Sequence, residues 1–190
     1  MLSWPSPDSL WLSQLPAIVP QNPVTSDLRY DVAIAGGGFT GLWTAYYLKR
    51  ADPALHIGVF DAKFAGYGAS GRNGGWASGL FASSKSQVAE LYGRSAAVQL
   101  YRVLAASIDE IGKVIQSEGI AADFHKGGTI TLALNQAQLR RLGYELAVER
   151  EFGFGHEDFQ LLEIDEIARR IGAADGAFWP LAEMALHSKS

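Results

Sequence analysis

A short apolar segment that opens directly into a glycine-rich turn constrains the fold of this 190-residue chain more than any other feature. Residues 31–35 predict a buried strand, and the next six residues, GGGFTG, carry the spacing G-x-G-x-x-G ahead of a helical pattern. In such an arrangement Gly36 permits a tight turn, Gly38 lets the backbone approach a phosphate, and Gly41 lets the helix pack closely on the strand. The helix N-terminus then offers free N–H groups and a positive dipole end to a pyrophosphate.

A second apolar segment, residues 56–60, follows this helix and ends at Asp61. The carboxylate lies 20 residues after Gly41, where a βαβ dinucleotide fold places the acid that binds a ribose. A carboxylate at this place would repel a 2′-phosphate, so the spacing disfavours NADP and leaves FAD or NAD. The alternative is that Asp61 is an ordinary turn residue at the end of a strand.

The composition is that of a globular protein and excludes several classes of function. Hydrophobic residues make up 48% and charged residues 19% of the chain, and the net charge of −4 comes without a basic block of the kind that binds nucleic acid. There is no cysteine, which excludes a disulfide, a thiol nucleophile and a cysteinyl–flavin bond. The four histidines are scattered, so no metal site is predicted. Neither a signal peptide nor a membrane span is visible, and we expect a cytoplasmic protein.

The pattern of elements divides the chain into three parts. Residues 1–29 form an extended, proline-rich N-terminal arm, residues 30–85 hold the βαβ unit and a glycine–serine loop, and residues 86–190 hold helices and part of a second sheet. The elements expected in the third part are helices over 86–119 with a break at Gly93, an antiparallel strand with one wet face over 129–134, and helices over 136–152 and 165–171.

The predicted fold class is α/β, a Rossmann-like βαβ start followed by part of an α+β domain, and it is incomplete. A dinucleotide fold of this kind needs about three or four parallel strands with helices on both faces. Only 31–35 and 56–60 have the pattern of buried parallel strands, and residues 178–190 run apolar without closing an element. We therefore expect the chain to be the front part of a larger protein.

Residues 66–76, GYGASGRNGGW, form the glycine–serine loop that follows the second strand. Its small side chains and flexible backbone N–H groups, together with Arg72 and Asn73, suit a segment that lies against a flat, polar ligand. Arg72 could act on a flavin or on a substrate carboxylate, and a contact with a phosphate or a structural ion pair is an equal alternative. The alternative is a solvated glycine loop without a ligand.

The glycine motif of residues 36–42, the acid at Asp61 and the string ASGRNGG of residues 69–75 together resemble the D-amino-acid-oxidase-like family of FAD-dependent oxidoreductases, and in particular its gamma-glutamylputrescine oxidase-like branch. The resemblance covers most of residues 25–185. It implies non-covalent FAD, with phosphate over the glycine turn, ribose on Asp61 and the flavin near residues 70–74. The cofactor-binding residues that it implies are Gly36, Gly38, Phe39, Thr40, Gly41, Asp61, Lys63, Ser70, Arg72, Asn73 and Gly74. The branch more often has Glu where Asp61 stands, so the charge is kept but the reach is shorter.

The resemblance further implies an enzyme that oxidises the C–N bond of a small amine or amino acid, with hydride transfer to the flavin and hydrolysis of the resulting imine. Members of the family are much longer and supply substrate and catalytic residues mainly from the part beyond residue 190, so no catalytic residue is predicted here. Two other hypotheses stay open. One is a truncated nucleotide-binding fragment without turnover. The other is an NAD-dependent Rossmann dehydrogenase, which the glycine–serine loop disfavours because such enzymes pass from their acid into another βα unit.

Overall fold

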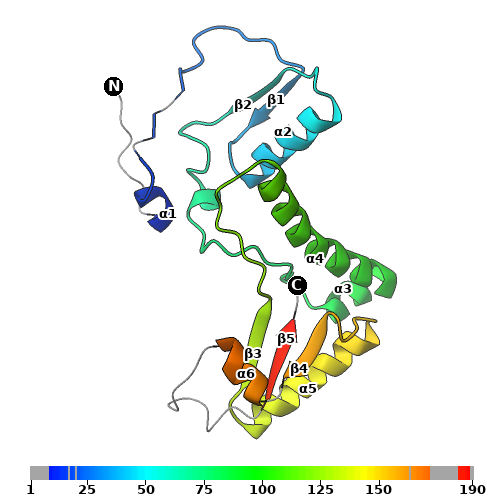
Figure 1. Ribbon diagram of the computed structural model, residues 1–190. Coiled ribbons are helices and arrows are strands. Elements are labelled where there is room, and N and C mark those ends of the chain that lie inside the picture. Colours follow the sequence, from blue (N-terminus) through cyan, green and yellow to red (C-terminus); the bar gives the residue numbers. More distant parts are fainter. Residues whose placement is uncertain (1–8, 17, 20, 163, 172–183, 189–190) are drawn as a thin grey trace. The chain divides into compact units, whose positions relative to one another are not determined.

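The computed structural model describes residues 9–16, 18–19, 21–162, 164–171 and 184–188. The chain divides into two compact units, Met1–Trp76 and Ala77–Ser190, and each is described here by itself (Figure 1). The first eight residues of the expected arm and most of the apolar stretch 178–190 lie outside the described residues. The division at residues 29 and 85 stays a prediction.

The first unit contains the expected strand, helix and second strand. β1 (Val32–Ala35) and β2 (Ile57–Phe60) pair in parallel, and α2 (Phe39–Ala51) connects them and packs on the sheet (Figure 1). The side chain of Lys49, in the last turn of α2, donates to two backbone carbonyls just beyond the helix. A cation at this end complements the negative end of the helix dipole.

Two short helices in the first unit carry no clear sequence signal. α1 (Leu10–Ser13) lies in the part expected to be an extended arm, and the 3₁₀ helix η1 (Ala69–Gly71) lies within the glycine–serine loop. The arm is thus partly helical, which corrects the expectation of a wholly extended segment for residues 10–13. A helix of four residues is too short to be predicted from propensity or periodicity, and tertiary contacts determine whether it forms.

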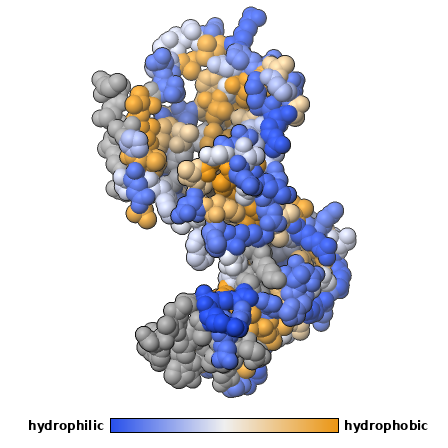
Figure 2. Space-filling model, viewed as in Figure 1, coloured by the Kyte–Doolittle hydropathy of each residue, from blue (hydrophilic) through white to orange (hydrophobic). Residues whose placement is uncertain are grey.

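Apolar side chains stay exposed in the first unit, where hydrophobic surface is visible around β1, β2 and α2 (Figure 2). Phe39 is 58% exposed, Leu42 is 44% exposed and Val59 is 37% exposed. The reason is geometric, because two strands and one helix cannot cover both faces of a parallel sheet. The observed layer is therefore part of an α/β fold, as the strand count in the sequence predicts.

The second unit begins with two helices that meet at a glycine. α3 (Lys85–Tyr92) and α4 (Arg94–Ser117) pack on each other, and Gly93 between them has a φ of 86°, a value that favours glycine. The predicted break at Gly93 is confirmed. α3 starts with a capping box, in which the Ser84 hydroxyl accepts from the Gln87 N–H and the Gln87 side chain accepts from the Ser84 N–H.

An antiparallel sheet with two helices forms the rest of the second unit. β3 (Thr129–Ala133), β5 (Met184–Ser188) and β4 (Phe159–Leu162) lie in that order across the sheet (Figure 1). α5 (Gln136–Glu151) follows β3 and α6 (Ile164–Ile171) follows β4. The strand β3 and both helices were expected from the sequence, whereas β4 and β5 were not.

The two helices pack on opposite faces of the sheet. Ala133 is fully buried against Leu142 of α5, while Ile130 and Leu132 pack against the cluster formed by Leu162 of β4 and Ile167 of α6. Thr131 lies on the same face as Ala133 and is exposed. The face of β3 that was expected to contact solvent is therefore exposed along most of the strand, and α5 covers it only at Ala133, the last residue of β3.

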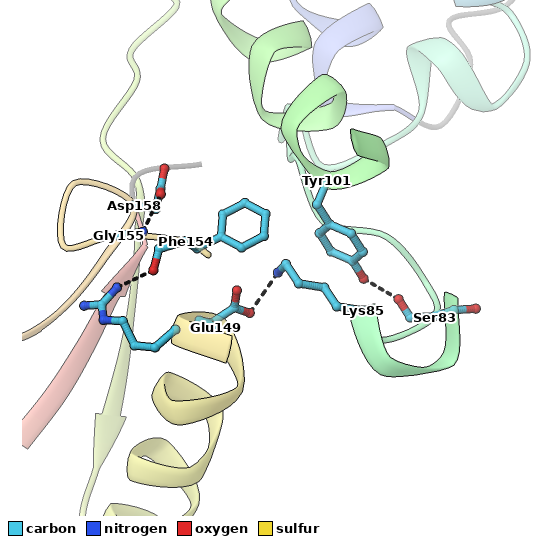
Figure 3. A network of polar contacts seen from close by, with 8 residues as sticks. Ser83, Lys85, Tyr101, Glu149, Phe154, Gly155 and Asp158 are labelled. Atoms are coloured by element: carbon cyan, nitrogen blue, oxygen red, sulfur yellow. Dashed lines mark hydrogen bonds and ion pairs between the residues drawn. The ribbon is translucent and has the colours of Figure 1, made fainter. Parts of the chain in front are cut away.

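A buried ion pair joins α3 to α5 inside the second unit (Figure 3). The Nζ atom of Lys85 lies 2.8 Å from the Oε1 atom of Glu149, 4.0 Å from the centroid of the Tyr101 ring and 4.6 Å from that of Phe154. The Tyr101 hydroxyl donates to the carbonyl of Ser83, and burial followed by the nearby Glu149 charge raises the pKa of Tyr101. Lys85 is only 8% exposed, so the pair and its aromatic surroundings anchor the start of α3.

Candidate cofactor-binding site

The glycine turn between β1 and α2 has the geometry that its sequence predicts. Gly36 has a φ of 103°, and its N–H donates to the carbonyl of Phe60 at 2.7 Å, which ties the turn to the end of β2. A Cβ atom on Gly41 would lie 2.0 Å from the backbone oxygen of Gly36, so no side chain fits there. The absence of a side chain at Gly41 is what lets α2 begin directly beside the strand.

The N-terminus of α2 presents hydrogen-bond donors that the described part of the chain leaves unused. Its N-cap residue is Gly38, which has no side chain to cap the helix. The N–H of Phe39 donates to the Ser70 hydroxyl at 3.0 Å, but no acceptor for the N–H groups of Gly38, Thr40 and Gly41 is present among the described residues. Orphan donors at a helix start, next to the positive end of the dipole, form a site for an anionic oxygen such as that of a phosphate.

Asp61 lies at the end of β2 with its carboxylate turned to the glycine turn. One oxygen, Oδ2, accepts from the N–H of Gly37 at 2.8 Å, and the other, Oδ1, accepts from the N–H of Lys63 at 2.9 Å. These two hydrogen bonds, with that of Gly37 the larger effect, lower the pKa of Asp61. The carboxylate is thus held ionised next to the turn, and its remaining lone pairs can accept hydrogen bonds from hydroxyl groups.

The glycine–serine loop packs on the same turn. The N–H of Gly66 donates to the carbonyl of Gly37 at 2.9 Å, and Ser70 reaches the start of α2 through its hydroxyl. A Cβ atom on Gly38 would lie 2.9 Å from the Ser70 oxygen, so the loop and the turn share one close contact. The turn, the acid and the first half of the loop therefore form one surface.

The second half of the loop is organised by its own side chains. The amide of Asn73 donates to the carbonyl of Ser70 at 2.7 Å and its Oδ1 atom accepts from the N–H of Gly75 at 2.7 Å. Arg72 donates to the carbonyl of Gly68 at 3.4 Å, and its guanidinium lies 5.2 Å from the centroid of the Tyr67 ring. These contacts hold the shape of the loop, and a role of Arg72 or Asn73 toward a ligand stays a prediction.

The structure thus brings together most of the residues that the sequence singles out. Those at the turn, the acid and the first half of the loop lie together: Gly36, Gly38, Phe39, Thr40, Gly41, Asp61, Lys63 and Ser70. The hydrogen bonds of Arg72 and Asn73 among the described residues stay within the loop and the N-terminal arm, and a Cβ atom on Gly74 would meet no atom within 4 Å. Open space beside Gly74 leaves room for a ligand.

Two contacts of this site were not predicted. Ser9 and Trp11, from the N-terminal arm, donate hydrogen bonds to the carbonyls of Gly71 and Asn73 in the loop. The pairs are separated by 62 residues, so no local pattern could have shown them. The sequence offers one weak signal for these bonds, which is that the indole N–H of a tryptophan in the arm needs a hydrogen-bond acceptor when it is buried.

Two other classes of site receive no support from the described part of the chain. It contains no group of three or more His, Cys, Asp or Glu residues that could hold a metal ion. Among its helices, none combines the length and the apolar character that crossing a membrane would require.

A parallel β1–α2–β2 unit with unused donors at the helix start and an ionised acid directly after the second strand defines a dinucleotide-binding fold. The family model described as "FAD dependent oxidoreductase" (DAO) matches residues 31–189, and the chain belongs to this family. FAD is the cofactor of the family, and the predictions of family, fold class and cofactor are confirmed. The unused N–H groups at α2 and the carboxylate of Asp61 fit the diphosphate and a ribose of that cofactor.

The chain is similar to two curated oxidoreductases and to one solved structure. It is 31% identical over 151 residues to the oxidoreductase named OrdL of Haemophilus influenzae, covering 80% of this chain and 34% of that protein. It is 30% identical over 158 residues to gamma-glutamylputrescine oxidoreductase of Escherichia coli, covering 81% of this chain and 35% of that protein. Glycine oxidase from Geobacillus kaustophilus shares the fold, with a TM-score of 0.50, 24% identity, and coverage of 84% of this chain and 39% of the other. The chain spans about a third of the length of these curated relatives.

Proposed function

We propose that residues 31–76 bind FAD non-covalently and that the protein oxidises the C–N bond of an amine or amino acid. The observation that carries the binding proposal is the uncapped start of α2, where three N–H groups beside the carboxylate of Asp61 have no acceptor among the described residues. The substrate class is supported by the relatives, since one is named for gamma-glutamylputrescine and the structural neighbour for glycine. A cytoplasmic location is part of the proposal and rests on the sequence alone.

Each residue of the site has a role in this proposal that follows from its chemistry. The N–H groups of Gly38, Thr40 and Gly41 donate to the diphosphate, and the bare Cα of Gly38 allows it to come close. Asp61 accepts from ribose hydroxyls with the lone pairs that its backbone donors leave free. The loop lies along the flavin side of the cofactor, where Gly74 offers room.

The same proposal assigns separate roles in the reaction to FAD and to the residues of this chain. When bound, FAD supplies the acceptor for the hydride that leaves the carbon next to nitrogen, and the imine so formed is hydrolysed by water to a carbonyl compound. The residues of this chain hold and orient the cofactor, and we assign no general acid or base to them. Substrate recognition is therefore outside the role that we propose for residues 31–76.

Anaerobic reduction tests the proposed reaction. The protein is loaded with FAD, and a panel of amines and amino acids, including gamma-glutamylputrescine and glycine, is added while the flavin absorbance is recorded. Bleaching by one class of amine, with formation of the matching carbonyl product, is the expected result. If dithionite bleaches the bound flavin but no amine does, this chain binds the cofactor without oxidising an amine, and the proposed reaction is wrong for it.

A further inference from the structure

The N-terminal helix α1 is attached to the glycine–serine loop at three neighbouring positions. The Ser9 hydroxyl donates to the carbonyl of Gly71 at 2.7 Å, and the indole Nε1 atom of Trp11 donates to the carbonyl of Asn73 at 2.8 Å. The ring of Trp11 also covers Gly75. Two directed hydrogen bonds and a ring contact over five residues of the loop fix α1 to the loop more specifically than apolar packing alone would.

The loop is shaped to receive the indole ring. A Cβ atom on Gly75 would lie 2.7 Å from the Cζ2 atom of Trp11, which is closer than carbon atoms approach each other. Gly75 also has a φ of 80°, a conformation that other residues adopt at a cost. Gly75 therefore needs glycine for two reasons, its backbone conformation and the space taken by the Trp11 ring. This indicates that the loop conformation and the position of Trp11 depend on each other.

A continuous series of contacts connects Trp11 to the N-terminus of α2. Trp11 bonds the backbone of Asn73, the Asn73 side chain bonds the backbone of Ser70, and the Ser70 hydroxyl accepts from the N–H of Phe39 at the first turn of α2. Each hydrogen bond in this series holds in place the residue that makes the next one. A substitution of Trp11 should therefore loosen the loop at Ser70, where the loop contacts the start of α2.

We propose that α1 is a clamp on the glycine–serine loop and that Trp11 is a positioning residue that sets the affinity for FAD. The inference rests on the proposed FAD site, and it goes beyond it because α1 lies outside residues 31–189, the part that matches the family model. Holding the loop in its bound shape before FAD arrives lowers the ordering cost of binding, so losing the clamp weakens binding without removing any contact to the cofactor.

Four variants of the full 190-residue chain separate the clamp from general packing. Trp11→Ala removes the ring and the donor, Trp11→Phe keeps an aromatic ring but has no N–H, and Ser9→Ala removes the second hydrogen bond. Leu10→Ala, in the same helix, is the matched control, because the Leu10 side chain is 66% exposed. Two quantities are measured: hydrogen–deuterium exchange of residues 66–76 in the absence of FAD, and the dissociation constant for FAD.

The expected result is a graded loss. Trp11→Phe and Ser9→Ala each raise the FAD dissociation constant about threefold, as expected for the loss of one hydrogen bond, and Trp11→Ala raises it about tenfold because the ring contact is lost as well. Exchange in residues 66–76 speeds up in the same order while exchange in β1 stays unchanged, and Leu10→Ala behaves as the wild type. A Trp11→Ala protein with wild-type exchange and wild-type FAD affinity overturns the clamp. A wild-type chain that binds no FAD overturns the proposed function itself and the clamp with it.

Discussion

The carboxylate of Asp61 accepts a hydrogen bond from the backbone N–H of Gly37, with 2.8 Å between nitrogen and oxygen. Gly37 lies in the turn after β1 and Asp61 follows β2, so the bond joins the two features from which the dinucleotide site was predicted. The neighbouring hydrogen bond, from the Gly36 N–H to the Phe60 carbonyl at 2.7 Å, also connects the glycine turn to the end of β2. The acid thus has a structural part in the turn as well as the proposed contact with a ribose.

Asp61→Asn should make the free energy of unfolding less dependent on pH. The folded-state pKa of Asp61 is lowered by the Gly37 and Lys63 hydrogen bonds, so its contribution to stability is present at neutral pH and is lost as the pH falls below about 4 toward the folded-state value. Urea midpoints of wild type and variant, measured from neutral pH downward, should therefore converge in acid. Asp27→Asn, at an exposed aspartate, is the control and should parallel the wild type. A constant difference between wild type and Asp61→Asn at every pH would contradict this explanation.

Lys85→Met should destabilise the second unit strongly. The substitution leaves the Glu149 carboxylate, 16% exposed, without its cation, and its Oε2 atom already has no partner among the described residues. Removing one member of a buried pair costs about 3–5 kcal/mol, which urea unfolding can measure. The double variant Lys85→Met with Glu149→Leu should recover most of this loss, because no buried charge remains unpaired.

A surface ion pair provides the control for this prediction. Lys126 and Asp109 pair with 34% and 52% of their side chains exposed, so Lys126→Met should change the free energy of unfolding by less than about 1 kcal/mol. Equal effects of Lys85→Met and Lys126→Met would show that burial of the Lys85–Glu149 pair has no energetic consequence.

Two helical glycines should respond in opposite ways to alanine. A Cβ atom on Gly143 in α5 meets nothing within 4 Å, so Gly143→Ala should raise the free energy of unfolding by about 0.5–1 kcal/mol through the lower backbone entropy of the unfolded chain. A Cβ atom on Gly112 in α4 would lie 2.9 Å from the Cε1 atom of Phe124, and Gly112→Ala should cost about 1–3 kcal/mol as this ring is displaced. Thermal or urea unfolding of the two variants side by side checks the signs, and stabilisation by Gly112→Ala would contradict the packing described for α4.

Local signals in the sequence account for most of the correct predictions. The order of apolar segment, glycine turn and helix determines β1 and α2, because each needs only neighbours within a few residues. The break at Gly93 is equally local, since a φ of 86° favours glycine. The capping box of Ser84 and Gln87 also has a local signature, S-x-x-Q, and could have been found.

Contacts between distant residues account for what was missed. β4 pairs with β5, and β5 lies between β4 and β3, so the sheet depends on segments more than 20 residues apart. The hydrogen bonds of Trp11 and Ser9 to the loop span 62 residues. No periodicity or turn chemistry encodes such pairs, which form only when the chain has folded. The site was therefore predictable where it is built from consecutive residues and not where the N-terminal arm completes it.

The central claim is that the turn, the acid and the loop bind FAD, and a titration of the chain with FAD followed by flavin absorbance tests it most directly. The decisive variant is Gly74→Val, because a Cβ atom there meets no protein atom within 4 Å, so we expect unfolding to be unchanged while the side chain occupies the space proposed for the flavin. Gly143→Ala, in the second unit, is the control for FAD binding. We expect the wild type and Gly143→Ala to bind one FAD per chain and Gly74→Val to bind it at least about tenfold more weakly, as expected when a side chain fills part of a binding site. A wild-type chain that stays colourless in excess FAD, or a Gly74→Val chain that binds FAD as tightly as the wild type, would contradict the proposed site.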